Sequence, residues 1–390
     1  MSRSVDRSAI DQVLQAAVAS GAVPHVAAIA ADADGVIYEA GFGPRVAGQA
    51  GEVTTGTEFA VMSMTKMIVT VAALQLVEQG RLDLDAPVDT YLPEFADVQV
   101  LEGWDGDTPR LRDPASRATV RHLLTHTSGL GYWFWDADIA RYEKVAGIPA
   151  PGAGRLDAFK APMVADPGTR FSYGINTDWL GRVVEAVAGT GLDVVIKEGV
   201  TGPLGMDGTS FTLPPGQEGA RAGVHVKTDG GAWSEIGDVV NRADPDWWAG
   251  GHGLFSTPRD YIRFERALLR GGELDGTRIL AAATVGEAFR NQIGDLDVPA
   301  AIPTADPVAS GPLDLGPGYK WGYGLLLNTA DIPGRRRAGT GAWAGLYNTH
   351  FWIDRASGIC ASLYSNSLPF IAPEPYRLYL DFETALYAAL

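Results

Sequence analysis

The order of strand-like and helical segments limits the folds open to this chain more than any other feature. Near the N-terminus, Val26–Ala30 and Val36–Ala40 have the composition of strands, and Asp34-Gly35 between them is a hairpin signal. Similar patterns return only near the C-terminus, at 322–327, 346–353 and 358–365. Strands from the two ends of a chain are most simply placed side by side in one sheet. We therefore expect an α+β fold with an antiparallel sheet, flanked by helices and built from both termini.

The expected helices divide the chain in the same way. Residues 8–20 place Ile10, Val13 and Leu14 on one helical face, and a second long helix begins near Ser63 and ends at Gln79. Further helical patterns cover 119–126, 177–188 and 375–389. We expect one domain from residues 1–95 and 255–390, and a mainly helical inserted domain from residues 96–254.

The composition and net charge of the chain indicate which kinds of partner and which cellular compartment to expect. The 390 residues are 46% hydrophobic and 20% charged, and 31 basic against 47 acidic residues give a net charge of −16. An acidic surface repels nucleic acid and anionic lipid, so we expect neither as a partner. The N-terminus has no apolar signal-peptide core, and no apolar run approaches about 18 residues. These absences predict a cytoplasmic protein, with Cys360 as a buried strand residue rather than a nucleophile.

Ser63-Met-Thr-Lys66 is the first candidate for catalysis. Positions i and i+3 share a helix face, so the Lys66 amine can reach the Ser63 hydroxyl. A serine needs a base to become a nucleophile, and a lysine serves as one only if burial or nearby positive charge lowers its pKa. The apolar residues on both sides supply that burial. The pattern alone is too short to be specific, and a helix-capping serine beside an exposed lysine would also satisfy it.

Longer blocks around this pair carry a family resemblance. They are, in chain order, Phe59–Lys66, Gly80–Val88, His122–Leu130, Pro203–Met206 and Ala249–Pro258. Together they resemble the family that includes class C β-lactamases, penicillin-binding proteins and family VIII carboxylesterases. The resemblance implies a β-lactamase-like fold, an acyl-enzyme on Ser63 and Lys66 as its general base.

The family also uses a tyrosine that shares the proton with the lysine. Tyr364-Ser-Asn366 matches the Tyr-x-Asn motif of β-lactamases. It lies on the last expected strand, however, and we interpret it as a chance match. Tyr173 precedes an expected helix and resembles the family VIII version. We expect the Lys66 cation to lower its pKa, and we interpret Asn176 as the N-cap of the following helix rather than a substrate clamp.

The third family motif is the Lys-Thr-Gly strand of β-lactamases, and Trp343-Ala-Gly345 stands at its place. A tryptophan offers an apolar wall where a lysine would bind a carboxylate, which favours a neutral ester substrate. The resemblance implies that Gly345 lets the acyl group approach and that the Ser63 and Leu346 amides form the oxyanion hole. The strand could also be core with no part in catalysis.

Other candidates are weaker. Trp133 and Trp135 are either core residues or walls of the cleft that select apolar groups. His122 and His126 are spaced i,i+4 on one expected helix, which we interpret as an ordinary helix face, and we expect no metal and no cofactor.

We therefore expect a serine carboxylesterase acting on short-chain esters as small-molecule substrates. An amidase or D-amino-acid peptidase, a weak β-lactamase and an acyltransferase are the alternatives on the same scaffold. A non-catalytic binding protein is less consistent with a retained serine and lysine.

Overall fold

A seven-stranded antiparallel sheet forms the centre of the protein. The structure is a computed structural model that describes residues 5–212, 220–237 and 245–390. The strand order is β13-β14-β15-β16-β17-β1-β2. The strands are β13 (Tyr319–Trp321), β14 (Leu326–Asn328), β15 (Gly341–Gly345), β16 (Thr349–Asp354), β17 (Ile359–Tyr364), β1 (Val26–Asp32) and β2 (Val36–Phe42). The sheet thus joins both ends of the chain, and the expected α+β, β-lactamase-like fold is confirmed.

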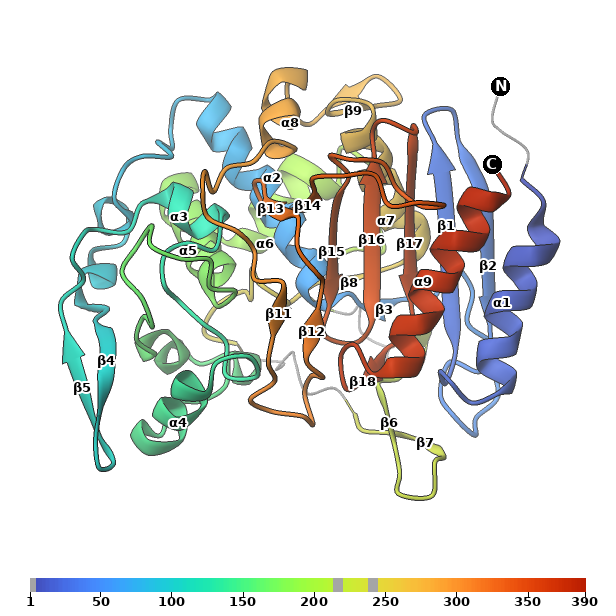
Figure 1. Ribbon diagram of the computed structural model, residues 1–390. Helices are drawn as coiled ribbons and strands as arrows, with labels where there is room; N and C mark the ends of the chain where they lie inside the picture. Colours follow the sequence, from blue (N-terminus) through green and yellow to red (C-terminus); the bar gives the residue numbers. More distant parts are fainter. Residues whose placement is uncertain (1–4, 213–219, 238–244) are drawn as a thin grey trace.

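Strand β1 shows how the sheet is covered on both faces. All seven of its residues are buried, and four of them are alanines, whose small side chains let helices approach closely. Successive side chains point to opposite faces, so Ala28 and Ala30 meet one hydrophobic cluster and Ile29 the other. Helices α1 (Arg7–Ala19) and α9 (Pro373–Ala388) lie side by side over the first face, and α7 (Pro258–Leu269) packs on the second (Figure 1).

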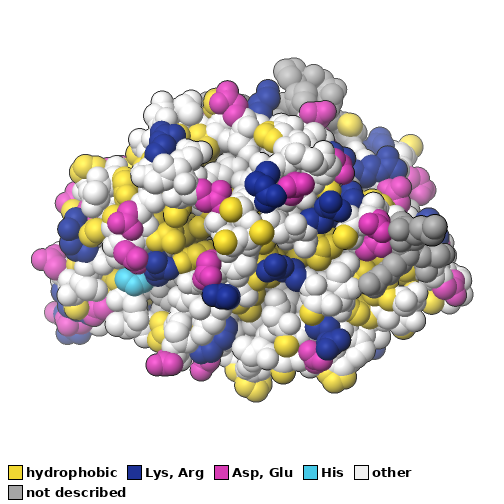
Figure 2. All heavy atoms as spheres, turned by 90° about the horizontal axis from the view of Figure 1, so that it is seen from above, with side chains coloured by type: hydrophobic (Ala, Val, Ile, Leu, Met, Phe, Trp, Pro, Cys, Tyr) yellow, Lys and Arg dark blue, Asp and Glu magenta, His cyan; other side chains and the backbone are white. Residues whose placement is uncertain are grey.

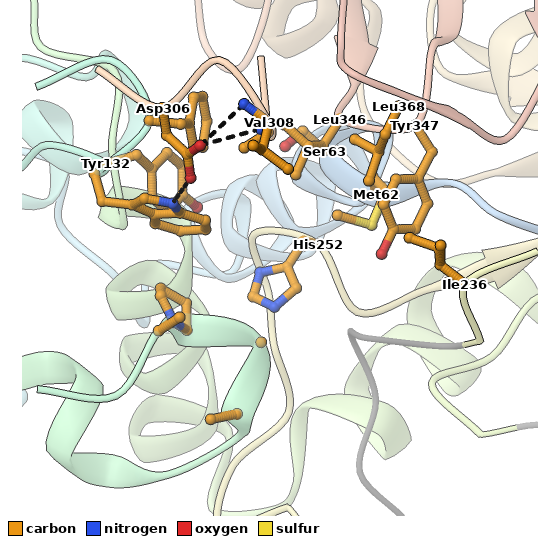
Figure 3. A pocket seen from close by; sticks show the side chains of 17 residues that line it. Met62, Ser63, Tyr132, Ile236, His252, Asp306, Val308, Leu346, Tyr347 and Leu368 are labelled. Carbon is orange, nitrogen blue, oxygen red and sulfur yellow. Dashed lines mark hydrogen bonds between the residues drawn. The ribbon is translucent and has the colours of Figure 1, made fainter. Parts of the chain in front are cut away.

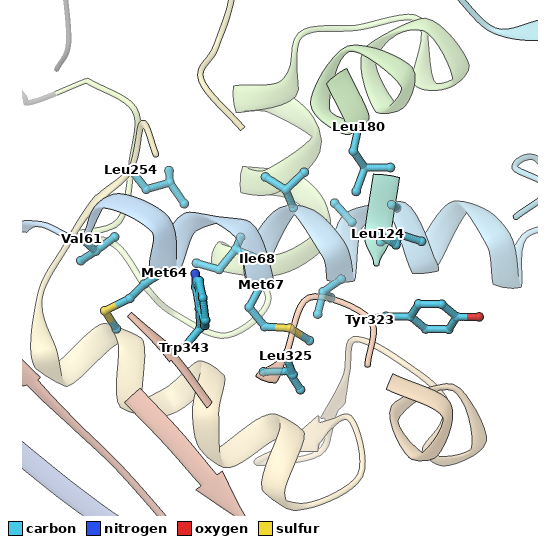
Figure 4. Close-up of a cluster of buried hydrophobic side chains, with 14 of the residues drawn as sticks. Val61, Met64, Met67, Ile68, Leu124, Leu180, Leu254, Tyr323, Leu325 and Trp343 are labelled. Carbon is cyan, nitrogen blue, oxygen red and sulfur yellow. The ribbon is translucent and has the colours of Figure 1, made fainter. Parts of the chain in front are cut away.

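Helix α2 (Thr65–Glu78) is enclosed by the rest of the protein. Eleven of its 14 residues are buried, which is the pattern of a helix surrounded on all sides rather than of a surface helix. Met64, Met67 and Ile68 pack among Leu180, Leu325 and other apolar side chains drawn from distant segments (Figure 4). This burial gives a rigid support to the turn that immediately precedes the helix.

The region between the two halves of the sheet is mostly helical. It contains α3 (Val120–Leu124), α4 (Ala137–Ala146), α5 (Asn176–Ala188) and α6 (Leu192–Ile196). It also contains two hairpins that the sequence did not predict, β4 (Val100–Asp105) with β5 (Thr108–Arg112) and β6 (His225–Lys227) with β7 (Trp233–Glu235). Helix α5 packs against α2 and so joins this region to the sheet half. The proposed boundaries at 95 and 254 stay a prediction.

Two expected strands differ from the structure. The segment 322–327 is largely the turn between β13 and β14, because Gly324 has a φ of +73° and a Cβ on Gly322 would lie 2.0 Å from the Ala288 carbonyl oxygen. The expected strand 346–353 begins three residues late, at Thr349, because Asn348 adopts a φ of 55° in the turn after β15. Both turns contain apolar residues, and for this reason the sequence pattern predicted strand at these positions.

The surface shows charges of both signs. On the face seen in Figure 2, basic and acidic side chains are interspersed, with apolar side chains between them. Within the described residues, no helix combines the length and apolar character that crossing a membrane requires.

Candidate active site

Ser63 lies in a short 3-10 turn, η1 (Met62–Met64), that leads directly into α2. Met62, the residue before it, has a φ of 51°, a left-handed conformation that is costly for a side chain of this size. The preceding Val61 is fixed by two bonds: its N–H donates to the Leu254 carbonyl, and its carbonyl accepts from Thr349 Oγ1. The strained turn therefore holds the serine in one position.

The Lys66 amine is buried and has three polar neighbours. Its Nζ lies 3.0 Å from Ser63 Oγ, 2.7 Å from the Gly251 carbonyl oxygen and 3.3 Å from the Tyr132 hydroxyl. The Tyr132 hydroxyl directs its own proton to Asp178 Oδ2, so it can only accept from the lysine. A neutral amine has two N–H groups and one lone pair. With the N–H groups on Gly251 and Tyr132, the lone pair faces Ser63.

Burial lowers the pKa of Lys66 to about 7, while the negative charge of Asp178 opposes the fall. An ordinary lysine is almost entirely protonated near neutral pH and could not accept a proton. At a pKa of about 7, roughly half of the molecules carry the neutral amine at neutral pH. Geometry and protonation therefore both suit proton transfer from Ser63 to Lys66.

Three residues that the sequence reasoning did not select complete the surroundings of the lysine. Asp178 is fully buried at the start of α5, accepts from Tyr132 through Oδ2 and accepts the Gly251 N–H through Oδ1. Gly251 in turn accepts from Lys66, which closes a ring of hydrogen bonds. Gly251 lies in one of the blocks that carried the family resemblance, Tyr132 lies two residues after another, and Asp178 lies five residues after Tyr173. Only the fold shows that they meet.

Tyr173 lies close to both Ser63 and Lys66. The Lys66 amine is 4.9 Å from its ring centroid, and its hydroxyl accepts a 2.8 Å hydrogen bond from Trp343 Nε1. Burial raises the pKa of Tyr173, and hydrogen bonds with Ser63 and Trp343 only partly oppose the rise. The expected lowering of this pKa by the Lys66 cation is wrong, because burial of the phenol raises its pKa and the negative charge of Asp178 adds to the rise. The phenol is thus neutral and has a proton to give.

The strand residues Trp343 and Gly345 lie near Ser63, but neither lines the cavity at Ser63. Trp343 does not line the cavity that holds Ser63, because its indole is directed at Tyr173 and packs against Trp321. A Cβ on Gly345 would lie 2.4 Å from the Val61 carbonyl oxygen and 2.8 Å from Met62 Cβ. The glycine therefore lets β15 approach the turn that holds Ser63. The approach of an acyl group to this strand stays a prediction.

A cavity of about 680 Å³ opens at Ser63, which is a size suited to a small organic molecule. Its lining is largely apolar and includes Leu346, whose backbone follows the end of β15 (Figure 3). Ser63 is in the first turn of its helical segment, where N–H groups lack helical partners, so its amide is a suitable donor to an oxyanion. The part of the Leu346 amide in such a site stays a prediction.

The two tryptophans predicted to wall the cleft separate in the structure. Trp133 lines the cavity and donates from Nε1 to Asp306 Oδ2. Trp135 does not line it. Its indole is buried behind Tyr173, at a ring separation of 5.5 Å, and bonds to Ser310 Oγ.

Two further sequence interpretations need correction. Asn176 is the first residue of α5 rather than its N-cap, and its buried side chain bonds to His126, Leu130 and Ser128 instead. His122 and His126 do not share a helix, because α3 ends at Leu124 and His126 follows with a φ of 53°.

The remaining two interpretations agree with the structure. Tyr364 is fully buried on β17 and bonds to Ser362, as expected of a structural residue. Cys360 is buried on the same strand.

Comparison with known proteins identifies the family of this chain. The family model named Beta-lactamase matches residues 10–386. The chain belongs to the beta-lactamase family. Ser63, Lys66 and Tyr173 thus occur in an enzyme of the serine hydrolase superfamily.

Individual relatives include enzymes of two activities. Monacolin J acid methylbutanoyltransferase of Aspergillus terreus is 31% identical, over 97% of this chain and 95% of its own. Lovastatin esterase of Penicillium rubens is 33% identical, over 90% of each chain. Unliganded simvastatin synthase (LovD) from Aspergillus terreus superposes with a TM-score of 0.83 at 30% identity, covering 97% of both chains. These names describe acyl transfer and ester hydrolysis.

Proposed function

We propose that this protein is a serine carboxylesterase that works through an acyl-enzyme on Ser63. The observation that carries the proposal is the buried Lys66 amine, whose two N–H groups are engaged and whose lone pair faces the Ser63 hydroxyl 3.0 Å away. Lys66 takes the proton as Ser63 Oγ attacks the ester carbonyl. The Ser63 and Leu346 amides hold the oxyanion.

Tyr173 has the role of acid toward the leaving group. Its pKa is raised, so the phenol keeps its proton until an alkoxide forms beside it. When it protonates the alkoxide, the resulting phenolate lies near the Lys66 ammonium, which has just gained the serine proton. Transfer of that proton back to the phenolate restores both groups. Water then attacks the acyl-enzyme and completes hydrolysis.

The apolar cavity supports an uncharged substrate. Trp343 takes the place at which the family's β-lactamases have a lysine, and the cavity wall around Ser63 offers a carboxylate no lysine or arginine side chain among the described lining residues. A neutral ester of modest size suits this lining better than a carboxylated β-lactam or a D-amino-acid peptide. The motif pattern around Tyr173 adds the resemblance to family VIII carboxylesterases.

Transfer of the acyl group to an alcohol other than water is the second candidate. It is favoured by the relative named a methylbutanoyltransferase, which matches nearly the whole chain. The acyl-enzyme is the same in both reactions, and only the group that attacks it differs.

The test uses p-nitrophenyl butyrate, p-nitrophenyl 2-methylbutyrate and a chromogenic cephalosporin, with the Ser63→Ala variant as control. Rapid ester turnover that Ser63→Ala abolishes, with little cephalosporin turnover, supports the esterase. The reverse preference overturns it. Adding a primary alcohol and measuring the new ester against the free acid distinguishes hydrolysis from acyl transfer.

A further inference from the structure

His252 is a polar side chain in the wall of the apolar cavity beside Ser63. It follows Gly251 directly, so its position is fixed by the same hydrogen-bond ring that holds Lys66. The residue is 7% exposed, yet it lines the cavity, where its ring lies among the other lining side chains (Figure 3). The catalytic steps proposed above make no use of it.

Three other lining side chains, those of Ser63, Tyr132 and Asp306, have polar atoms with functions or hydrogen-bond partners, and Tyr347 adds a further buried hydroxyl to the wall. Ser63 is the nucleophile, and the Tyr132 hydroxyl lies between Lys66 and Asp178. Asp306 accepts from Trp133 and from the backbone N–H groups of Val308 and Ala309. By contrast, His252 Nε2 is buried and has no hydrogen-bond partner among the described residues.

The neighbours of the other ring nitrogen favour one tautomer. His252 Nδ1 lies 3.7 Å from Asp178 Oδ1. Because both Asp178 oxygens accept hydrogen bonds, the nitrogen that faces them is the one that carries the ring proton. Nε2 is then left with a lone pair. Burial and the nearby Lys66 lower the pKa of His252, so the ring stays neutral and Nε2 remains an acceptor.

We propose that His252 Nε2 is a polar recognition point of the cavity and binds a hydrogen-bond donor, such as a hydroxyl, on the ester substrate. A buried acceptor without a partner is costly, and a bound hydroxyl removes that cost while an alkyl group cannot. The preferred esters are then hydroxylated ones. The hydroxyl belongs either to the acyl part or to the alcohol part, and both present the same chemistry to Nε2. This inference rests on the proposed function and names the substrate class for it.

The test compares esters that differ only in a hydroxyl and a methyl group of similar size. For the acyl part the pair is p-nitrophenyl 3-hydroxybutyrate and p-nitrophenyl 3-methylbutyrate. For the alcohol part it is 2-hydroxyethyl butyrate and propyl butyrate, followed by acid release. We expect one pair to show a preference of about 2- to 12-fold in kcat/KM for the hydroxylated ester, as a single neutral hydrogen bond supplies.

Two variants separate recognition from structural damage. The amide of His252→Asn reaches the Nδ1 position and keeps a donor toward Asp178, but it leaves nothing at Nε2. The amide of His252→Gln reaches the Nε2 position. We expect the preference to vanish in His252→Asn and to return in part in His252→Gln. Because the preference is a ratio within one variant, a general loss of activity does not change it.

The result that would overturn the role of His252 differs from the result that would overturn the proposed function. If p-nitrophenyl butyrate is turned over through Ser63 but neither pair shows a preference that His252→Asn removes, the inference is overturned and Nε2 holds only water. If no ester is turned over through Ser63, the proposed function itself fails.

Discussion

Trp343 Nε1 donates a hydrogen bond to the Tyr173 hydroxyl oxygen over 2.8 Å, and this bond decides where the tyrosine proton points. With one lone pair of the phenol engaged by the indole, the O–H is free to face the nucleophile. An indole carries no charge, so the phenol keeps the high pKa that its burial imposes. A strand tryptophan thus orients the tyrosine without ionising it.

Trp343→Phe removes this donor and retains a ring in the core. We expect kcat to fall by about 2- to 12-fold, the value of one neutral hydrogen bond, because Tyr173 loses its orientation. KM for p-nitrophenyl butyrate should change little, since Trp343 does not line the cavity. Steady-state kinetics check this. A large rise in KM at constant kcat would instead mean that the indole contacts the substrate.

The pH dependence of the reaction should follow the Lys66 amine. Its pKa is lowered to about 7, and the reaction needs its neutral form, so protonation at lower pH removes activity. We expect kcat/KM to fall about tenfold for each pH unit below this value and to be level above it, until another group titrates. A profile measured with a neutral ester checks this. A level profile down to about pH 5 would exclude Lys66 as the base.

The parts of the site that sequence reasoning found are those that short segments define. Ser63 and Lys66 are three residues apart on one helical segment, and their contact follows from helix geometry. Tyr132, Asp178 and Gly251 are far apart in sequence, and their ring of hydrogen bonds exists only after the fold brings α5 against α2. The formation of one sheet from both ends of the chain could be inferred, because strand patterns cluster at those ends. The close approach at Gly345 could not be inferred, since it depends on the turn at Met62, which is far from Gly345 in sequence.

Asp178→Asn tests the electrostatic setting of the lysine. The Asp178 charge raises the pKa of Lys66 against the effect of burial, so its removal lowers that pKa further. We expect the acid limb of the kcat/KM profile to move to lower pH. The asparagine oxygen can still accept from Gly251, so thermal denaturation should show a folded protein and serves as the control. An acid limb that moves to higher pH would contradict this account.

Gly345→Ala tests the close approach of β15 to the nucleophile turn. The added Cβ would lie 2.4 Å from the Val61 carbonyl oxygen, a backbone atom that cannot move without displacing Met62 and Ser63. Such overpacking costs about 1–3 kcal/mol of stability. We expect a lower Tm together with a lower kcat. Ala344→Gly, a neighbouring change that adds no atom, is the matched control. An unchanged kcat in Gly345→Ala would show that the turn does not depend on this contact.

Trp133 and Trp135 are two residues apart, but their substitution should affect different properties, chain-length preference for Trp133 and stability for Trp135. Trp133 lines the cavity at Ser63, so Trp133→Ala enlarges the space for the acyl chain and should raise kcat/KM for p-nitrophenyl octanoate relative to the acetate. Trp135 is buried against Tyr173 and Phe370, and Trp135→Ala leaves a void that costs about 3–5 kcal/mol of stability. Its octanoate-to-acetate ratio should match that of the unaltered protein even if total activity falls.

Chain-length profiles and denaturant unfolding of the Trp133→Ala and Trp135→Ala variants check these expectations. An unchanged ratio in Trp133→Ala would mean that the acyl chain lies elsewhere in the cavity, because Trp133 forms the wall beside Tyr132 that the chain would otherwise contact.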